Sequence, residues 1–155
     1  MLFRSDSYYQ FIELILKNQN NPFFPRIHSA ILTFEKEIEK YMLMIVMEKL
    51  VSLKTVNVAA RHILSQLGIS DTKEIGELED DDFEWMKYWF EMGSYRRKLI
   101  ASSKNPQFKK AMALLEPYFA EHGPDMHEGN IMVRSTGHGP QLVLIDPLFP
   151  SGLYY

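Results

Sequence analysis

The first apolar residues of the chain recur at the spacing of an amphipathic helix. Positions three and four apart lie on one face of a helix, so this pattern predicts a helix with one buried side. That side would consist of Tyr8, Phe11, Ile12, Ile15 and Leu16. Ser5 or Asp6 can cap the first turn, and the Asn-Gln-Asn-Asn-Pro segment 18–22 is expected to end the helix, because Asn and Pro favour turns.

Two apolar runs with β character follow this helix. Ile27 to Phe34 and Tyr41 to Met47 are predicted to form a hairpin around the charged turn Glu35 to Glu37. The second run is apolar on both faces, which favours a central position in a sheet. Methionine adapts to irregular gaps, so the methionines of this run are expected to fill the core beside a cleft: Met42, Met44 and Met47.

The middle of the chain has a helical pattern. Helices are predicted at Thr55 to Leu67, with Gly68 as C-cap, at Asp81 to Ser102, and from Pro106 to the Gly123-Pro124 stop. The first and the last of these helices are expected to bury Val56, Ala59, Ala60, Ile63, Leu64 and Leu67, and Phe108, Met112, Leu115 and Phe119, respectively.

Two short apolar strands are predicted near the C-terminus, Ile131 to Arg134 and Leu142 to Ile145, joined by a Gly-rich turn at 135–140. The order of elements is then a helix, two strands, three helices, a loop and a short hairpin. It predicts an α+β fold that is mostly helical and has a small antiparallel sheet. A chain of 155 residues favours one domain, with residues 1–48 as a smaller part and residues 49–155 as the helical part.

Composition narrows the functions that this chain can have. Its net charge of -3 gives no basic field, so no nucleic acid partner is expected. It has no cysteine, which excludes a disulfide scaffold, a thiolate zinc site and a cysteine nucleophile. The longest apolar stretch, Met42 to Met47, is too short to cross a bilayer, and no signal peptide pattern is present. We therefore expect a cytoplasmic protein with no membrane partner.

The basic run Arg96-Arg97-Lys98 is expected to be a solvated helix end rather than a site for an acidic partner.

Three oxygen-bearing side chains follow the last predicted helix at a suggestive spacing. Asp125 begins a loop, Asn130 stands five residues later, and Asp146 ends the last strand. Phosphoryl transfer needs a metal ion that bridges phosphate oxygens and a group that accepts the proton of the attacking hydroxyl. Carboxylate and amide oxygens suit Mg²⁺. Each residue alone could be ordinary turn chemistry, and it is the combination with the hairpin between them that favours a catalytic site.

The residues of this region resemble a known family. The segment Asp125 to Met132 (Asp-Met-His-Glu-Gly-Asn-Ile-Met) resembles the catalytic loop of the early serine/threonine protein kinases of T-seven-like bacteriophages. The sequence Leu-Ile-Asp-Pro at 144–147 is similar to the metal-binding segment of that family, where most kinases carry Asp-Phe-Gly. Aminoglycoside phosphotransferases share a weaker form of the loop. The resemblance is specific over residues 123–149 and concerns only the order of elements over residues 5–120.

The resemblance implies a protein kinase-like fold and a phosphotransferase that uses ATP and Mg²⁺ on protein serine or threonine. Asp125 would be the catalytic base, Asn130 a magnesium ligand and Asp146 the main metal ligand. The first helix would correspond to the one that braces a phosphate-binding lysine. Glu13 is the only acid inside this helix and is therefore the candidate for that ion pair.

The same resemblance implies a nucleotide-binding hinge after the second strand. Glu48 and Leu50 would offer backbone groups to an adenine ring, and Met47 would limit the depth of its pocket. The sequence also departs from the family. The first glycine is Gly68 and the first lysine is Lys17, whereas the family carries a glycine-rich loop and a strand-borne lysine before the first helix. Removing such a charge clamp should lower the rate by orders of magnitude.

Three interpretations follow from these matches and departures. The first is a truncated kinase-like phosphotransferase that binds Mg-ATP. The second is a non-catalytic kinase-like protein that engages a host protein, as a phage-encoded regulator would. In the third, which is compatible with both, the open edge of the small sheet pairs with a second chain or forms a dimer, because open strand edges recruit other strands.

Overall fold

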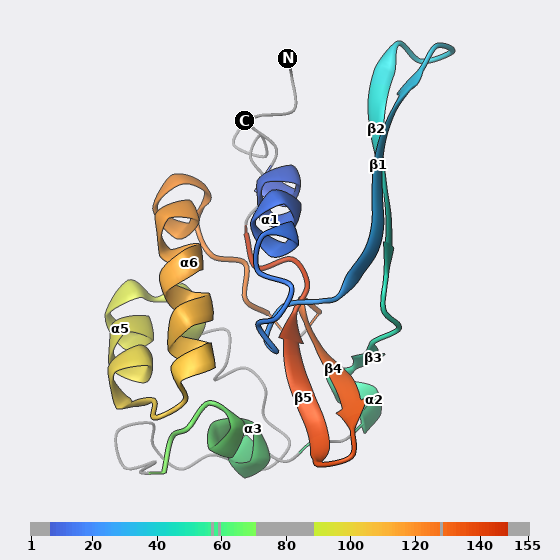
Figure 1. The fold of residues 1–155 in the computed structure, drawn as a ribbon. Coiled ribbons are helices and arrows are strands. Elements are labelled where there is room, and N and C mark those ends of the chain that lie inside the picture. Colours follow the sequence, from blue (N-terminus) through green and yellow to red (C-terminus); the bar gives the residue numbers. More distant parts are fainter. Residues whose placement is uncertain (1–6, 57, 59, 71–88, 128, 149–155) are drawn as a thin grey trace.

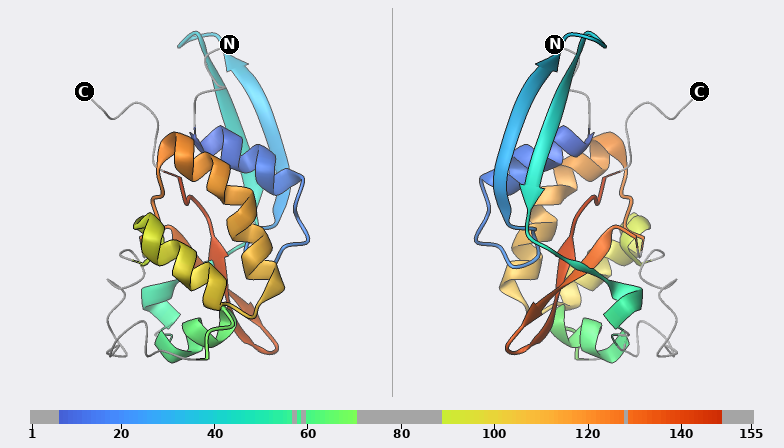
Figure 2. Two further views of the ribbon diagram at one scale, coloured as in Figure 1. Left: turned by 90° about the vertical axis from the view of Figure 1, so that its left-hand side faces the viewer. Right: turned by 90° about the vertical axis from the view of Figure 1, so that its right-hand side faces the viewer.

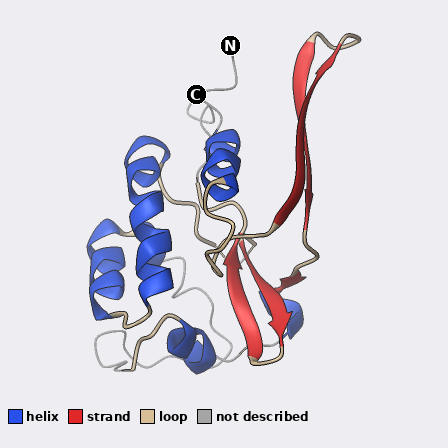
Figure 3. Cartoon of the chain, in the orientation of Figure 1, coloured by secondary structure: helices blue, strands red, loops and turns tan. Residues whose placement is uncertain are grey.

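The computed structural model describes residues 7–56, 58, 60–70, 89–127 and 129–148, and Figure 3 shows its helices and strands. Helices combine with two small antiparallel sheets, so the predicted α+β class is confirmed. The described elements are α1 (Ser7–Leu16), β1 (Ile27–Glu35), β2 (Lys40–Met47), β3 (Val51–Ser52), α2 (Leu53–Val56), α3 (Ala60–Gln66), α5 (Gly93–Ser102), α6 (Pro106–His122), β4 (Ile131–Thr136) and β5 (Gly139–Leu144).

The helices α1, α5 and α6 lie together beside the β4–β5 hairpin (Figure 1). α6 contacts both α1 and α5, and α3 contacts β5. β3 adds a third strand to β4 and β5, with Val51 opposite Val133. β1 and β2 form a separate two-stranded sheet, which extends beyond the helices in both views of Figure 2.

The first predicted helix is confirmed as α1. Its buried side includes Phe11, Ile12 and Ile15, as the spacing predicts, whereas Leu16 is 46% exposed because it falls at the edge of this face. Asn18 ends the helix as expected. Its side-chain amide donates to the Leu14 carbonyl at 2.9 Å and so satisfies one of the carbonyls that a helix end leaves without an intrahelical partner.

The first predicted hairpin is confirmed, with β1 paired to β2 from Ile27 opposite Met47 to Glu35 opposite Lys40. The prediction that the second strand is central is wrong for the described part of the chain, where β1 is the only neighbour of β2. Met42 and Met44 are 50% and 55% exposed, so they do not fill the core. An apolar pattern shows which side chains would gain from burial, but it does not show whether another segment of the chain packs against them.

The single helix predicted at 55–67 is interrupted. The described residues form β3, α2 and α3 instead, and Val56 is 37% exposed at the end of α2. The run from Thr55 to Val58 contains three β-branched residues, which lose side-chain freedom in a helix, so it is a natural place for a break. The expected burial of Ala59 and Ala60 lies outside what the structure describes. The remaining three positions are buried as predicted: Ile63, Leu64 and Leu67.

Gly68 ends α3 in the predicted C-cap role. Its φ of 74° is in the left-handed region that glycine adopts without strain. The Gly68 N–H donates to the Ser65 carbonyl at 3.0 Å, and the Ile69 N–H donates to the Leu64 carbonyl at 2.9 Å. This pair of hydrogen bonds is the Schellman motif, and it turns the chain sharply away from α3.

The helix predicted at 81–102 falls partly outside the described residues, which resume at Trp89. The described part is not one continuous helix, because Met92 has an extended backbone and stands at the N-cap of α5. Arg96, which was expected at a solvated helix end, is buried. Its guanidinium donates to the Phe90 carbonyl at 2.7 Å and to the Glu116 carboxylate on α6 at 3.1 and 3.2 Å. The prediction for Arg96 is therefore wrong, and this residue joins α5 to α6.

The predicted helix from Pro106 is confirmed as α6, the longest described helix. Asn105 caps it by accepting hydrogen bonds from two backbone N–H groups of the first turn, and Pro106 occupies the first helical position, where proline is tolerated. Its predicted buried positions are all buried: Phe108, Met112, Leu115 and Phe119. None of the described helices, α6 included, is long and apolar enough to cross a membrane.

Two adjacent phenylalanines in the segment between α1 and β1 tie the core together. Phe24 meets Phe11 of α1 at 6.1 Å between ring centroids, and Phe23 meets Phe108 of α6 at 5.5 Å. The Phe23 carbonyl also accepts a hydrogen bond from the Leu144 N–H at 2.8 Å. The segment therefore holds α1, α6 and the end of β5 at fixed positions.

We expect Gly68→Ala to destabilise the protein strongly. A Cβ at this position would lie 2.4 Å from the Asn105 nitrogen and 2.8 Å from the Lys104 nitrogen, both backbone atoms. The left-handed conformation adds roughly 1–2 kcal/mol of strain for a residue with a Cβ. Urea denaturation should report a loss in the free energy of unfolding above this strain alone. The matched control is Gly137→Ala, where a Cβ meets nothing within 4 Å, and a change within about 0.5 kcal/mol is expected. Equal effects of both changes would contradict this account.

Candidate functional site

The loop that follows α6 is held against the end of the chain's last strand. α6 stops at Gly123, whose N–H donates to the Phe119 carbonyl at 2.9 Å. Pro124 then forms an antiparallel bridge with Leu148. The Asp125 N–H donates to the Pro147 carbonyl at 2.8 Å. The backbone of Asp125 is therefore fixed beside the residue that follows Asp146.

Asn130 lies between the two halves of this arrangement. Its side-chain nitrogen donates to the Asp125 carbonyl at 2.9 Å, and its own carbonyl accepts from the Ile145 N–H at 3.0 Å. Because the amide nitrogen points into the loop, the amide oxygen is the end of the group that can accept a further contact. Both neighbours of Asp146 in the chain are thus hydrogen-bonded to the Asp125–Asn130 loop. The structure brings together the backbones of all three predicted residues.

Asp146 follows β5 and carries one buried carboxylate oxygen, Oδ1. The pKa of the hydroxyl of Tyr8, a residue of α1, is raised mainly by burial and in addition by the negative charge of Asp146. The first helix thus stands next to this acid. A carboxylate with a buried oxygen loses part of its hydration, so a cation beside it would gain a strong electrostatic partner.

His127 is a residue of the site to which the sequence pattern assigned no role. Its Nδ1 accepts a hydrogen bond from the Gly129 N–H at 3.0 Å, and its Nε2 lies 3.7 Å from Asp125 Oδ1. Since Nδ1 is an acceptor here, a neutral ring carries its proton on Nε2, the nitrogen that faces Asp125. At 3.7 Å this is an electrostatic contact rather than a hydrogen bond, and through it His127 can orient the carboxylate. The signal for this role was its position two residues after the acid, in a loop where Gly129 leaves room for the ring: a Cβ on Gly129 would lie 2.7 Å from the ring.

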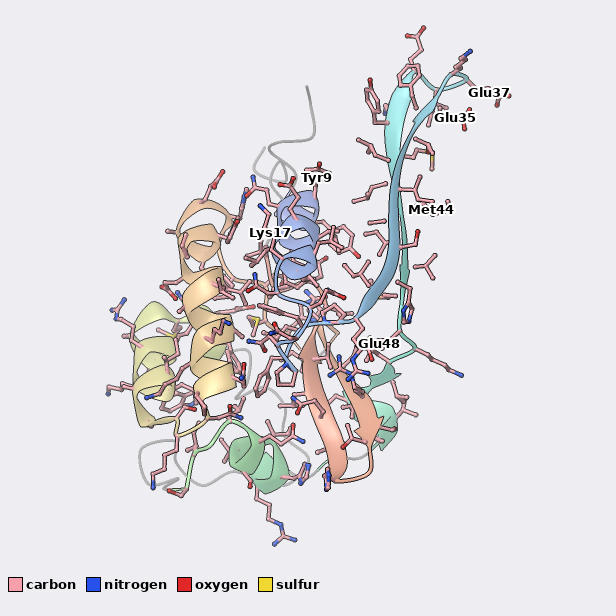
Figure 4. All side chains as sticks on the ribbon, viewed as in Figure 1. Tyr9, Lys17, Glu35, Glu37, Met44 and Glu48 are labelled. Atoms are coloured by element: carbon pink, nitrogen blue, oxygen red, sulfur yellow. The ribbon has the colours of Figure 1, made fainter. Side chains whose placement is uncertain are left out.

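The predicted hinge residues lie at the base of the β1–β2 hairpin. Met47 ends β2, and Glu48 follows it at the base of the hairpin (Figure 4). The Glu48 N–H donates to the Arg26 carbonyl at 2.9 Å, so an adenine ring would have to use other backbone groups of this connector. Leu50 is half-buried just before β3, and Glu13 is exposed on α1. These four residues keep their predicted roles only as hypotheses.

The side chain of Glu48 takes part in a buried ion pair that the sequence did not indicate. The Arg134 guanidinium donates to Glu48 Oε2 at 2.7 Å and forms a second, shorter bond to Oε1. It also donates to the Pro22 and Phe24 carbonyls, each at 3.0 Å. Glu48 Oε1 further accepts from the Arg26 N–H at 2.8 Å. Two-pronged bonding of this kind is the geometry for which a guanidinium is suited.

The electrostatics of Glu48 follow from these contacts. Burial works to raise the pKa of its carboxyl group, but the hydrogen bonds from Arg134 and the Arg26 backbone, with the charges of both arginines, outweigh burial and lower it. Glu48 therefore stays ionised in the folded protein. Its charge is paired with that of the Arg134 guanidinium.

The donor set of the site suits a magnesium ion that is also bound by phosphate. Among the described residues no group of three or more His, Asp and Glu side chains could hold a metal ion by itself. Asp125, Asn130 and Asp146 offer two carboxylates and one amide. Magnesium commonly takes one or two carboxylates and completes its shell with water and substrate phosphates, so these residues fit that cation.

A hollow of about 310 Å³ lies away from these acids, between α5 and α6. Its lining includes Ile100 and Met112, with Arg97, Lys109 and Glu116 as its charged residues. None of the predicted site residues lines it, so it is separate from the candidate site.

Comparison of the chain with protein-family models, with curated proteins and with solved structures gives no match.

Arg134→Met should destabilise the fold by about 1–3 kcal/mol near neutral pH, because it leaves the partly buried Glu48 carboxylate without its guanidinium. Since the pKa of Glu48 is lowered on folding, its contribution to stability is present above the ordinary value of 4.5 and is lost as the pH falls through the folded value. Chemical denaturation of the native protein from pH 7 to pH 3 should show this loss. In the variant Glu48→Gln this pH-dependent contribution to the free energy of unfolding should be absent.

The double variant Arg134→Met with Glu48→Leu provides the matched control. It removes both charges together, and much of the stability that Arg134→Met alone loses should return. A double variant no more stable than Arg134→Met would show that packing, rather than the unpaired charge, carries the effect.

Proposed function

We propose that the loop 124–130 and the end of β5 bind a magnesium nucleotide, and that the chain is a kinase-like phosphotransferase. The observation that carries this proposal is the set of hydrogen bonds that links Asp125 to Pro147 and Asn130 to Ile145. These bonds bring an acid, an amide and a second acid to one place from two separate segments. If each of the three residues were only an ordinary turn residue, nothing would require them to lie next to one another.

Each side chain has a chemical role in this proposal. Magnesium, when bound, neutralises the charge on the phosphate oxygens. Asp146 and the amide oxygen of Asn130 would hold the ion, and the Asn130 nitrogen holds the Asp125 backbone in register with them. Asp125 would accept the proton of the attacking hydroxyl, with His127 orienting its carboxylate. Protein serine or threonine is the substrate that the family resemblance suggests.

A second candidate function is a non-catalytic kinase-like protein that regulates a partner protein. Two observations favour it. The Glu48 N–H is already used by Arg26, so the connector has fewer groups for an adenine ring. The first lysine of the chain, Lys17, follows α1 and is exposed, so it is not a strand-borne lysine of the kind that clamps phosphate (Figure 4).

Mg-ATP should stabilise the native protein against heat. At a free concentration ten times the Kd, the gain is RT ln 11, about 1.4 kcal/mol, which raises Tm by roughly 3–6 °C for a chain of this size. Scanning fluorimetry with and without Mg-ATP measures this shift. Asp146→Ala should abolish it, because the metal loses its main carboxylate, and so should replacing magnesium with a chelator.

Glu35→Ala is the control for the loss of one negative charge, since Glu35 stands at the far tip of the hairpin (Figure 4). This variant should keep the full thermal shift. If millimolar Mg-ATP leaves Tm unchanged in the native protein, or if Asp146→Ala responds as the native protein does, the nucleotide site is not where we place it.

Asp125→Asn separates the two candidate functions. If the chain transfers phosphate, this variant should keep the Mg-ATP thermal shift, because the proposed metal ligands remain, and should lower the transfer rate by about 10²–10⁴-fold. Release of labelled phosphate, and its incorporation into protein, measure the rate. A native protein that binds Mg-ATP without turnover, together with an unchanged Asp125→Asn variant, would favour the non-catalytic function.

A further inference from the structure

The β1–β2 hairpin carries much exposed apolar surface, although three of its residues, Ile27, Leu43 and Ile45, pack against the core. Figure 4 shows its side chains projecting on both sides of the two strands, far from the helices at the tip. Eight large apolar residues of this hairpin are each about half exposed: Ile31, Leu32, Phe34, Ile38, Tyr41, Met42, Met44 and Val46. A two-stranded hairpin is at best marginally stable in water by itself, so a surface of this kind indicates an interaction site.

The register of the hairpin divides these residues between two faces. Leu32 opposite Leu43 and Phe34 opposite Tyr41 lie on one face, where the last two rings pack at 5.0 Å between centroids. The other face carries the pair of Ile31 and Met44 and, beyond it, the residues Met42 and Val46. A strand with apolar residues on both faces is normally central in its sheet. β2 has this composition, yet one of its edges has no neighbour among the described residues.

The two edges of the hairpin differ in the partner they suit. β1 contains polar residues that suit an outer edge, among them His28, Ser29 and Thr33. β2 is apolar from Tyr41 to Met47. Because open edges pair with other strands, we expect the outer edge of β2, rather than that of β1, to pair with a further strand.

We propose that two copies of this chain pair along β2 in an antiparallel fashion, about a two-fold axis that passes beside Met44. The pairing joins two hairpins into one four-stranded sheet, with the β1 strands as its outer edges. A two-fold axis makes the contact self-complementary and closed, so it gives a dimer and not a fibre. Met44 then faces Met44 of the second copy, and Met42 faces Val46 of the second copy.

The charges at the two ends of the hairpin favour this antiparallel arrangement. The tip is acidic overall, because Glu35, Glu37 and Glu39 outnumber Lys36 and Lys40. The base is basic on its exposed side, since Arg26 and Lys49 are exposed whereas Glu48 is neutralised by Arg134. Antiparallel pairing brings the acidic tip of each copy to the basic base of the other. A parallel pairing would place two acidic tips side by side.

The strand that would form the contact carries half of these exposed apolar residues. Of the eight, Tyr41, Met42, Met44 and Val46 lie on β2, whereas Ile31, Leu32 and Phe34 lie on β1 and Ile38 lies between the two strands. Pairing along β2 therefore brings the first four next to the second copy, and the main-chain hydrogen bonds of the new strand pair add to the contact.

The position of Met44 at the axis can be tested by cross-linking, because the chain has no cysteine of its own. Directly opposed residues of antiparallel strands have Cα atoms about 4.5–5.5 Å apart, within the range that a disulfide spans. Met44→Cys should therefore form a covalent dimer under mild oxidation. Ile31→Cys is the matched control, since Ile31 pairs with Met44 in the hairpin, has the same face and similar exposure, and lies on the other edge. It should stay monomeric on a non-reducing gel.

Light scattering after size exclusion provides the second measurement. The native protein should have twice the mass of the 18.2 kDa chain at micromolar concentration. Met44→Lys should give the monomer, because two like charges would face each other at the axis, whereas Ile31→Lys should leave the dimer intact. A monomeric native protein overturns the proposal. Equal cross-linking of both cysteine variants, or a dimer that resists Met44→Lys and is broken by Ile31→Lys, overturns the pairing along β2.

Discussion

The buried ion pair of Arg134 and Glu48 is the interaction on which the arrangement of this molecule depends. It joins three segments that are distant in sequence: the end of β2, the segment before β1, and the middle of β4. Apart from this pair, the two-stranded sheet meets the body through its strand ends and through Ile27, Leu43 and Ile45, which pack against the core. The pair is tolerated because each of the three guanidinium nitrogens has a hydrogen-bond partner.

The candidate site depends on the same strand. β4 begins at Ile131, directly after Asn130, and carries Arg134 three residues later. The strand thus has the proposed magnesium ligand at one end and the anchor of the first hairpin near its middle. Hydrogen bonds between backbone atoms fix the remaining parts of the site, so the positions of Asp125 and Asp146 do not depend on flexible side-chain contacts. Sites held on strand ends in this way are more precise than sites on free loops.

Local patterns in the sequence were sufficient for most of the elements. α1, the first hairpin, α6 and the β4–β5 hairpin follow from periodicity and from caps such as Asn105 and Gly68. The errors concern features that depend on partners distant in the chain. Arg96 looks like a solvated basic residue until α6 brings Glu116 to it, and the apolar β2 looks central although no second neighbour is present among the described residues.

The candidate site was likewise predictable only in the part that local sequence spacing determines. The spacing of Asp125, Asn130 and Asp146 predicted that they would meet, and the backbone hydrogen bonds agree with it. The Glu48–Arg134 pair could not be predicted, because 86 residues separate the two and neither stands in a motif. The role of His127 depends on which ring nitrogen accepts the Gly129 N–H, which composition and spacing do not reveal.

The first hairpin is anchored at its base by the guanidinium of Arg134, and most of the length of β1 and β2 extends beyond this anchor (Figure 1). On the other side of the anchor, β4 leads from Arg134 back to Asn130. A displacement of the hairpin base would therefore act on β4, the strand that begins directly after Asn130.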